Sequence, residues 1–342
     1  MKIGLVGYQG SGKSTLFEWL TGVTADPSLS HTLQSAMATV HDDRLDQLSE
    51  IYRPKKITEA SLEIVDTPGL DRKHEGNAAR LAAIREAACL VHVVAAFDGS
   101  DFEADLEGFE EDLLLGDLEI VSGRVERLRE STRKPRPNRD EQLTELAAIE
   151  PILETLEAGK ALSTMDLSKD QLKVIKSFQL LTRKRRLALI NVGDDEQELD
   201  TYKRLSTEQR PVVAVPIGLE LELSRMDPSE RDEFRAEMGL QCFDQPALIR
   251  TIMEASGQML FFTAGEKEVR TWLIPKGATA VEAADSIHSD LARGFIRAET
   301  MNCEDLVRLG SEREVKANNL MRQEPKDYVV QDGDILNIRF SV

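Results

Sequence analysis

Short apolar runs alternate with amphipathic helical patterns along much of the chain. A short apolar run without polar alternation is typical of a strand buried on both faces, and such strands occur in parallel sheets covered by helices. The pattern therefore predicts an α/β fold built on a parallel sheet. The predicted strands cover residues 3–6, 62–65, 89–97, 187–191 and 212–217.

A long interval between the third and fourth predicted strands carries two runs of helical spacing instead of a strand pattern. Residues 132–139 between these runs include two prolines and no apolar residue, so they predict a turn in an antiparallel helical hairpin. The first arm, about residues 105–131, would be roughly 40 Å long, and Pro151 would kink the second arm or begin a new helix. The apolar seam has coiled-coil spacing and comprises Leu114, Leu118, Val121, Val125 and Leu128, then Leu143, Leu146, Ile149, Leu153 and Leu156.

The pattern changes again after about residue 260, where strand-like and helical segments alternate at short intervals. Residues 268–274 predict a strand, and Thr279 with Glu282 predicts a helix that opens with a capping box. Asp332-Gly333 predicts a turn that joins two strands. These segments favour a small α+β domain of about 80 residues.

The strongest motif is Gly-Tyr-Gln-Gly-Ser-Gly-Lys-Ser at residues 7–14, a full GxxxxGK[ST] match between a predicted strand and a predicted helix. Glycines let backbone N–H groups surround a phosphate, and the positive end of the following helix faces the same anion. Lys13 is expected at the β- and γ-phosphates and the Ser14 hydroxyl at Mg²⁺. The alternative is a plain glycine turn. The nucleotide-binding residues predicted here are Gly10, Ser11, Gly12, Lys13, Ser14 and Thr15.

A second motif, Asp66-Thr67-Pro68-Gly69-Leu70, follows the next strand and fits the DxxG segment of nucleotide switches. Asp66 would hold Mg²⁺ through water and the Gly69 N–H would sense the γ-phosphate, so Lys13 and Gly69 are the predicted catalytic groups. The same residues alone would also suit a β-turn. Leu70 stands where such switches often have a water-orienting glutamine, and an apolar side chain cannot polarise water.

The third metal ligand of such a switch is a threonine from a polar loop. Thr32, in the loop 28–32, is the candidate, and Thr24 and Thr39 compete with it. The predicted Mg²⁺ set is therefore Ser14, Thr32 and Asp66.

Base recognition is expected from Asn191-Val192-Gly193-Asp194, after the strand at 187–191. Guanine-reading switches have NKxD there, with a lysine across the base and an aspartate on the guanine N–H groups. Asn191, Val192 and Asp194 are the predicted contacts. Because Val192 replaces the lysine, strict selectivity for GTP is not expected.

Charge and cysteine content narrow the class of protein. The chain has 342 residues, with 43 Lys and Arg against 61 Asp and Glu, a net charge of −18. This charge excludes general coating of nucleic acid or anionic membrane, because such binding uses Lys and Arg against phosphates. The three cysteines have no metal-ligand spacing and no apolar run is long enough to cross a membrane. A cytoplasmic protein without membrane or specific DNA binding is expected.

The negative charge is concentrated between Asp98 and Glu119, where ten acidic residues and no Lys or Arg occur. Two short basic runs elsewhere stand out against this acidic background. A local RNA-docking footprint would need such runs; solvated charged loops are the alternative. The runs are Arg133, Lys134, Arg136 and Arg139 at the hairpin turn, and Arg183, Lys184, Arg185 and Arg186 where the insert ends.

With these residues placed, nearly the whole chain resembles the YchF, or Obg-like, ATPases of the translation-factor class of P-loop proteins. The segments that carry the resemblance, beyond the P-loop, are Asp43-Arg44-Leu45-Asp46-Gln47-Leu48, Leu180-Leu181-Thr182, residues 229–234, residues 262–270, Gly294-Phe295-Ile296-Arg297-Ala298-Glu299 and residues 326–334.

The resemblance implies a P-loop domain at 1–97 and 187–259, a helical coiled-coil insert at 98–186, and a β-grasp-like TGS domain at 260–342. It also implies an ATP-preferring switch with a ribosome-associated role. Together with the motifs, this predicts a Mg²⁺-dependent switch whose nucleotide state controls docking to the ribosome or ribosomal RNA. The Asn191 and Asp194 pair approximates the family's NxxE base motif.

Departures from the family bear on turnover. Gly10 replaces an asparagine implicated in monovalent-cation binding, so K⁺ is a doubtful cofactor, and the loop after residue 97 lacks the family's histidine implicated in hydrolysis. His74 is either a substitute water-orienting group or a solvated loop residue, and His92 is expected to be a satisfied core histidine. The expected function is a switch that hydrolyses ATP, or GTP, at the ribosome. The alternative is a nucleotide-gated ribosome- or RNA-binding module with little or no hydrolysis.

Overall fold

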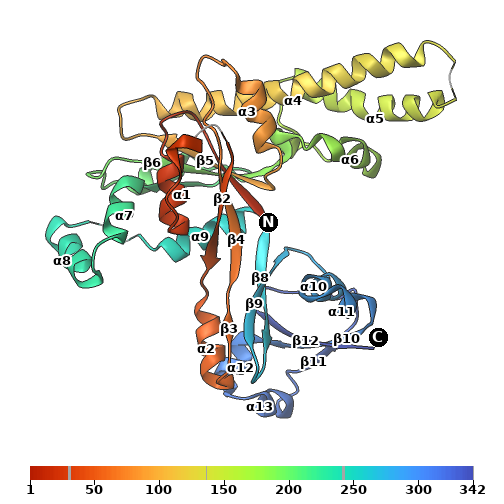
Figure 1. Ribbon diagram of the computed structural model, residues 1–342. Helices are drawn as coiled ribbons and strands as arrows, with labels where there is room; N and C mark the ends of the chain where they lie inside the picture. The colour runs from red at the N-terminus through yellow and green to blue at the C-terminus, as the bar shows by residue number, and fades with distance from the viewer. Residues whose placement is uncertain (30–31, 136, 241–242, 342) are drawn as a thin grey trace. The chain divides into compact units, whose positions relative to one another are not determined.

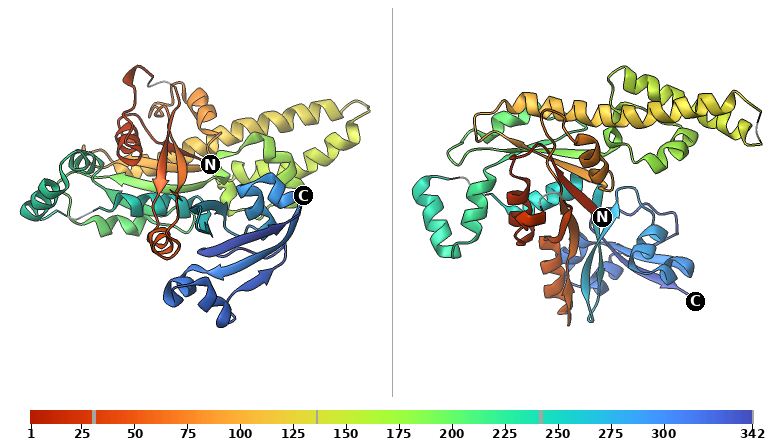
Figure 2. Two further views of the ribbon diagram at one scale, coloured as in Figure 1. Left: turned by 60° about the horizontal axis from the view of Figure 1, so that its bottom comes forward. Right: turned by 45° about the horizontal axis from the view of Figure 1, so that its top comes forward.

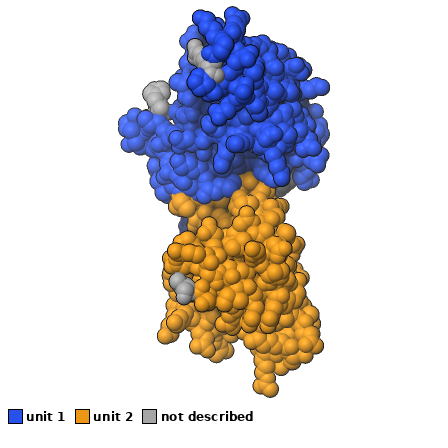
Figure 3. All heavy atoms as spheres, turned by 90° about the vertical axis from the view of Figure 1, so that its right-hand side faces the viewer, with its two compact units in different colours: residues 1–36, 63–243 blue, residues 37–62, 244–342 orange. Residues whose placement is uncertain are grey.

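The computed structural model describes residues 1–29, 32–135, 137–240 and 243–341. It divides into two compact units, coloured separately in Figure 3: unit 1 comprises residues 1–36 and 63–243, and unit 2 comprises residues 37–62 and 244–342. The predicted domains cut the chain at other positions and stay a prediction. Residues 30–31 of the predicted switch loop, Arg136 of the first basic run and Cys242 lie outside the described residues.

Unit 1 is built on the predicted parallel sheet, of which β2 and β4 continue into unit 2. Strands form where the apolar runs predict them, and all seven residues of β5 are buried. β1 lies parallel to β4 and β5, and the parallel pairing continues from β5 to β6 and from β6 to β7. The strand order is β2 (Gln34–Val40), β4 (Ala60–Asp66), β1 (Lys2–Val6), β5 (Cys89–Ala95), β6 (Arg185–Asn191) and β7 (Val212–Val215).

β2 is the strand of this sheet that the sequence pattern does not predict. Its exposed and less exposed positions alternate, and Ala38 and Val40 are its only fully buried residues. Such a strand lacks the continuous apolar run by which the other strands are recognised.

Helices cover both faces of the unit 1 sheet, with α3 and α4 on one face and α1 and α7 on the other (Figure 1). Phe109 and Leu113 of α4 face the sheet and pack with Val6, Leu81 and Leu90. The helices of this unit are α1 (Lys13–Thr21), α3 (Asn77–Ile84), α4 (Phe102–Thr132), α5 (Arg139–Glu157), α6 (Lys169–Ile175), α7 (Ile217–Ser224) and α8 (Pro228–Met238).

The predicted hairpin is present: α4 and α5 run side by side and extend beyond the sheet (Figures 1 and 2). Its core contains Val121, Val125, Leu128, Ile149, Leu153 and Leu156 from the predicted seam, while Leu114, Leu118 and Leu146 are partly buried against it. Leu143 departs from the prediction, being 39% exposed. α5 continues through Pro151, so the idea that a new helix begins there is wrong.

Unit 2 contains a mixed sheet with helices against both faces. β8 and β9 form an antiparallel pair, while β12 lies parallel to β8 and antiparallel to β10. The topology does not test the TGS assignment. The strand order is β11 (Arg322–Glu324), β10 (Phe295–Asn302), β12 (Asp334–Phe340), β8 (Gln258–Ala264), β9 (Val269–Pro275) and β3 (Ile57–Thr58). The helices are α2 (Asp43–Tyr52), α9 (Gln245–Ala255), α10 (Ala280–Ile287), α11 (Ser289–Arg293), α12 (Cys303–Leu309) and α13 (Glu312–Ala317).

α2 lies far from the other helices of unit 2 in sequence, yet it supplies part of their core. Leu45 and Leu48 are almost fully buried in a cluster with Phe262 and Val269. Arg44 bonds both Asp42 within the segment and Asp332 at the other end of the chain. The segment 43–48 is therefore a packing element of the C-terminal sheet.

Two predictions for the C-terminal region have different outcomes. α10 begins where the Thr279 signal predicts, with the Glu282 carboxylate accepting a 2.7 Å bond from the Thr279 backbone N–H. The turn at Asp332-Gly333 leads into β12 as predicted, but residues 328–330 form no strand. Tyr328 O accepts from Ala280 N instead, so this segment is bonded to the beginning of α10.

None of the helices in the described part of the chain is both long enough and apolar enough to cross a membrane.

Candidate functional site

The phosphate loop lies between β1 and α1, and two of its glycines have no room for a side chain. Gly7 has φ of 139°, and a Cβ there would lie 2.3 Å from Val93 O. Gly12 has φ of 98°, and a Cβ there would lie 2.4 Å from Asn191 Nδ2. Neither position admits a side chain. α1 begins at Lys13 directly after Gly12, with no capping side chain, so its first N–H groups face the loop.

Lys13 is buried beside the second motif. Its side chain is 7% exposed and Nζ donates a 2.7 Å hydrogen bond to Tyr8 O. A Cβ on Gly69 would lie 2.8 Å from this Nζ, so the glycine of the DxxG segment and the lysine are in contact. Burial lowers the pKa of Lys13 to about 8, although nearby Asp66 opposes the shift.

Ser14 and Asp66 are brought together. The Ser14 hydroxyl donates a 2.6 Å bond to Asp66 Oδ2, and Asp66 Oδ1 is buried without a partner among the described residues. Burial also raises the pKa of Asp66, although the hydrogen bond from Ser14 and the charge of Lys13 oppose the shift. A hydroxyl and an underused carboxylate oxygen suit a hard cation such as Mg²⁺.

Thr32 is not joined to this pair. Its hydroxyl donates to Leu29 O at 2.9 Å, within its own turn, and among the described residues it contacts neither Ser14 nor Asp66. Its role as a metal ligand stays a prediction.

Asn191 holds the phosphate loop in place. Its Nδ2 donates to Ser11 O at 3.1 Å and its Oδ1 accepts from Ile217 N at 3.2 Å, so both ends of the amide are used. Val192 is 2% exposed and its N–H donates to Val215 O. Asp194 is exposed, as a base-reading acid needs to be.

A pocket of about 610 Å³ joins the phosphate loop to the Asn191 loop. Phe97 lines it with 47% of its surface exposed, and sequence reasoning missed this residue. Phe97 follows β5, which lies next to β1 in the sheet, and ligands bind at the carboxyl ends of such strands. The signal is therefore the strand order, which the sequence around Phe97 does not give. The lining comprises Gly10, Gly12, Thr15, Phe97, Asn191, Val192, Gly193, Asp194, Asp195 and Gly218.

Leu70 is a buried packing residue and does not face the solvent. Its side chain is 2% exposed and packs with Tyr8 and Phe109. Its backbone N–H donates to Gly7 O at 2.9 Å and its carbonyl accepts from Gln9 N at 3.0 Å. The residue therefore ties the switch segment, residues 66–76, to the phosphate loop.

The two histidines considered from sequence differ sharply. His74 is largely exposed, yet its Nδ1 lies 2.8 Å from Asp112 Oδ1 on α4. His92 is buried and its ring stacks on Phe109 at 3.9 Å. The prediction that His92 lies in the core is confirmed, but the prediction that it is satisfied there is wrong, since neither ring nitrogen has a partner among the described residues. Burial holds its pKa well below the usual value, so the ring is neutral.

Two of the four residues of the second basic run, Lys184 and Arg186, bond to other residues of unit 1. Lys184 Nζ donates to Arg85 O at 2.7 Å and to Ala87 O at 2.5 Å. Arg186 is 5% exposed and pairs with Glu110 at 2.6 Å. Among the described residues, Arg183 and Arg185 of this run are exposed, as are Arg133, Lys134 and Arg139 of the first.

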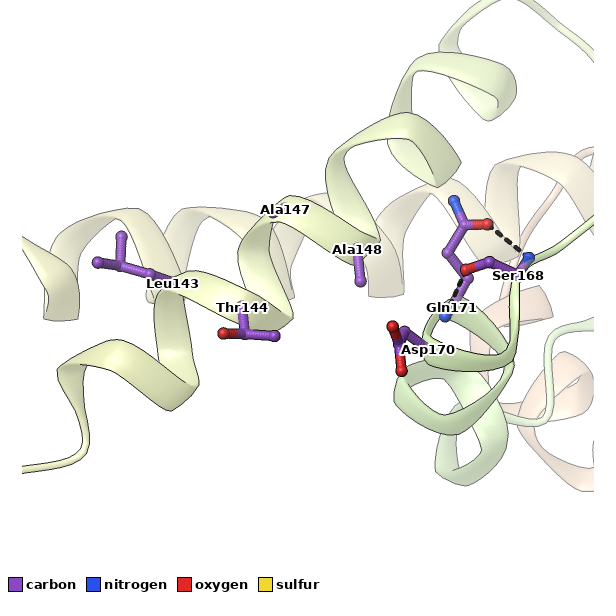
Figure 4. Close-up of a pocket in the computed structure, with 7 residues that line it drawn as sticks. All are labelled: Leu143, Thr144, Ala147, Ala148, Ser168, Asp170 and Gln171. Atoms are coloured by element: carbon purple, nitrogen blue, oxygen red, sulfur yellow. Dashed lines mark hydrogen bonds between the residues drawn. The ribbon is translucent and has the colours of Figure 1, made fainter.

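A second pocket of about 620 Å³ lies between α5 and α6 (Figure 4). Asp170 is its one charged residue, and Ser168 and Gln171 are bonded to each other as a capping box. It lacks the converging polar groups of the phosphate-loop pocket. The remaining lining is Leu143, Thr144, Ala147 and Ala148.

The chain is similar to known proteins over its full length. The family model YchF-GTPase_C, described as a protein of unknown function, matches residues 259–341, and a model described as 50S ribosome-binding GTPase matches residues 2–119. The chain is 36% identical to "Ribosome-binding ATPase YchF" of Escherichia coli O157:H7, covering 100% of this chain and 99% of that protein. It is 35% identical to "Obg-like ATPase 1" of Oryza sativa subsp. japonica, covering 100% and 92%.

Solved structures agree as well. The Schizosaccharomyces pombe YchF GTPase superposes with a TM-score of 0.81 at 27% identity, covering 99% of this chain and 97% of that one. A GTP binding protein from Pyrococcus horikoshii OT3 has a TM-score of 0.62 at 17% identity over both whole chains, which supports the fold alone.

Proposed function

The chain belongs to the YchF family, and from this premise we propose that it is a Mg²⁺-dependent nucleotide switch that binds and hydrolyses ATP and docks on the ribosome. The observation that carries the proposal is the grouping of Lys13, Ser14, Asp66 and Gly69 around one loop. The E. coli and Oryza relatives are named as ATPases, and the E. coli one as ribosome-binding.

Within this proposal the chain's own residues bind and orient the nucleotide. Lys13 and the first N–H groups of α1 hold the phosphates, while Ser14 and Asp66 hold the cation, with Thr32 as the proposed third ligand. Mg²⁺, when bound, neutralises the charge that the phosphates share. Gly69 leaves room for Lys13, as its missing side chain allows.

Base choice is assigned to the pocket beyond the phosphate loop. Phe97 offers a flat apolar face, and Asp194 and Asp195 offer acceptors for exocyclic N–H groups. No lysine of the described part of the chain lines this pocket, so the base is not covered as in NKxD switches. ATP is the proposed ligand, and GTP is the competitor to test. Displacement of one fluorescent nucleotide by ATP and by GTP decides this, and tighter displacement by GTP would contradict it.

A second function, a nucleotide-gated docking module without turnover, is favoured by Leu70. Its side chain is buried and cannot orient water. Single-turnover phosphate release, with and without ribosomes and with and without K⁺, separates the two. Release equal to buffer in every condition would reject hydrolysis and keep binding. Cosedimentation with ribosomes in the presence of ATP tests the docking half independently.

A further inference from the structure

Asp112 on α4 is a buried carboxylate that the proposed chemistry does not use. It is 3% exposed, and its oxygens accept hydrogen bonds from two parts of the nucleotide site. Tyr8 Oη of the phosphate loop donates at 3.0 Å, and His74 Nδ1 of the switch segment lies at 2.8 Å. Asn77 Nδ2, at the beginning of α3, is 3.5 Å away. One side chain of the helical arm, which is the hairpin of α4 and α5, therefore holds three residues around the nucleotide site.

A second pair of residues strengthens the same junction two turns earlier on α4. Arg72 of the switch segment donates to both oxygens of Asp105, at 2.9 Å and 2.5 Å. The Arg72 guanidinium also lies 5.1 Å from the centre of the Tyr8 ring. Because a bidentate pair fixes orientation as well as distance, the switch segment is held to α4 at two places.

Tyr8 connects this junction directly to the phosphate lysine. Its carbonyl accepts from Lys13 Nζ at 2.7 Å, while its hydroxyl donates to Asp112. A nucleotide phosphate competes for the same lysine, since phosphate is the stronger acceptor. A shift of Lys13 towards phosphate therefore removes a hydrogen bond from the Tyr8 carbonyl. The hydroxyl of the same tyrosine is bonded to Asp112 on α4.

α4 carries the junction outward without a break. The helix runs from Phe102 to Thr132, so Asp112 and the buried Val125 of the hairpin core belong to one continuous element. A small shift at one site can be amplified through packed elements, so a rotation of α4 near its beginning would displace its far end. Glu111, the neighbour of Asp112 in sequence, is exposed and takes no part in these contacts.

We propose that Asp112, through Tyr8 and His74, is a positioning residue that couples the nucleotide site to the helical arm, so that nucleotide binding moves the arm. The proposal rests on the proposed function, because it needs a bound nucleotide. By linkage, a partner that holds the arm changes nucleotide affinity by the same factor. The arm is then the element through which a docking partner senses the nucleotide state.

The experiment measures the distance between spin labels at the arm turn and on the body of unit 1. The full chain carries Lys134→Cys and Glu208→Cys in a Cys242→Ser background, since the native Cys89 and Cys303 are buried. Distances are recorded with and without a saturating non-hydrolysable ATP analogue and Mg²⁺. Each sample is also titrated with the analogue, and its melting is followed by circular dichroism.

The expected result is a change in mean distance on the order of several Å on nucleotide binding, lost in Asp112→Asn and in Tyr8→Phe. Tyr8→Phe keeps the buried ring and removes one donor, so it serves if Asp112→Asn fails to fold. Glu111→Gln is the matched control and keeps the change. A change retained in both variants, or an unchanged distance in the parent with nucleotide bound, overturns the coupling. Absence of nucleotide binding in the parent rejects the proposed function itself, and the coupling with it.

Discussion

The Ser14 hydroxyl donates a 2.6 Å hydrogen bond to Asp66 Oδ2. The two residues lie 52 positions apart, one in the first turn of α1 and the other at the end of β4. Because β4 pairs with β1, and β1 leads into the phosphate loop, the sheet itself brings the carboxylate to the hydroxyl. Two oxygens that suit a divalent cation are therefore placed by the main framework of unit 1.

Gly10 and Gly12 of the phosphate loop are expected to differ in their tolerance of alanine. Gly12→Ala places a Cβ 2.4 Å from Asn191 Nδ2, whereas a Cβ on Gly10 meets nothing within 4 Å. Both residues have positive φ, so both variants are strained. We expect Gly12→Ala to abolish binding of a fluorescent ATP analogue and Gly10→Ala to weaken it by about tenfold or less. Equal affinities of the two variants would contradict the packing account.

Lys13 predicts a pH dependence of nucleotide affinity. Its pKa is lowered to about 8, mainly by burial, so the free protein loses the ammonium charge as the pH rises through 8. Phosphate prefers the charged form, so affinity is full below pH 7 and falls by up to about tenfold per pH unit above 8. Titrations at pH 7, 8 and 9 measure the slope. Lys13→Arg is the control, because a guanidinium does not titrate in this range; a flat profile in the parent would refute the prediction.

Asp117 predicts a large loss of stability on neutralisation. It is fully buried on α4, pairs with Arg85 at 2.7 Å and accepts from the backbone N–H groups of Leu181 and Thr182. Asp117→Asn leaves Arg85 without its counter-charge, so we expect a loss of about 3 kcal/mol in the free energy of unfolding by urea. The exposed Glu119→Gln is the control and should change it by less than about 0.5 kcal/mol.

His41 predicts a stability that depends on pH in unit 2. A hydrogen bond with Glu59, 2.9 Å from Nδ1, raises the pKa of His41, and the charges of Asp46 and Asp43 add to the effect. The folded pKa lies above the unfolded one, so the stabilisation is full below pH 6.5 and is lost as the pH rises through the folded pKa.

Denaturation followed by tryptophan fluorescence, to which Trp272 of unit 2 contributes, provides the measurement. His41→Gln should be less stable than the parent at pH 5.5 and close to it at pH 8.5. A difference that is the same at both values would show that the imidazole charge is not involved.

Much of the site could be predicted because its signals are local. The glycines, Lys13 and Ser14 stand in one short motif whose chemistry requires that order, and Asp66 follows a clear buried strand. β2 could not be predicted in the same way, since its residues alternate in exposure and lack an apolar run. The place of Phe97 depends on which strands neighbour each other, which the residues around it do not encode.

The role of the charged residues could be predicted least. The acids of residues 98–119 stand out in sequence only as a run of negative charge, yet Asp105, Asp112 and Asp117 bond to the switch segment, the phosphate loop and the end of the insert. Lys184 and Arg186 look like part of a docking run, but their partners inside unit 1 are distant in sequence. Charge pairing of this kind follows from the tertiary fold, not from local pattern.

The most direct test of the account is equilibrium binding of a fluorescent ATP analogue in Mg²⁺ to the parent and to Lys13→Ala, with the exposed Lys160→Ala as control. The account predicts saturable binding by the parent and by Lys160→Ala. It also predicts a loss of affinity of about 10- to 100-fold in Lys13→Ala, since a hydrogen bond to a charged group is removed. Undiminished affinity in Lys13→Ala would contradict the assignment of the nucleotide site.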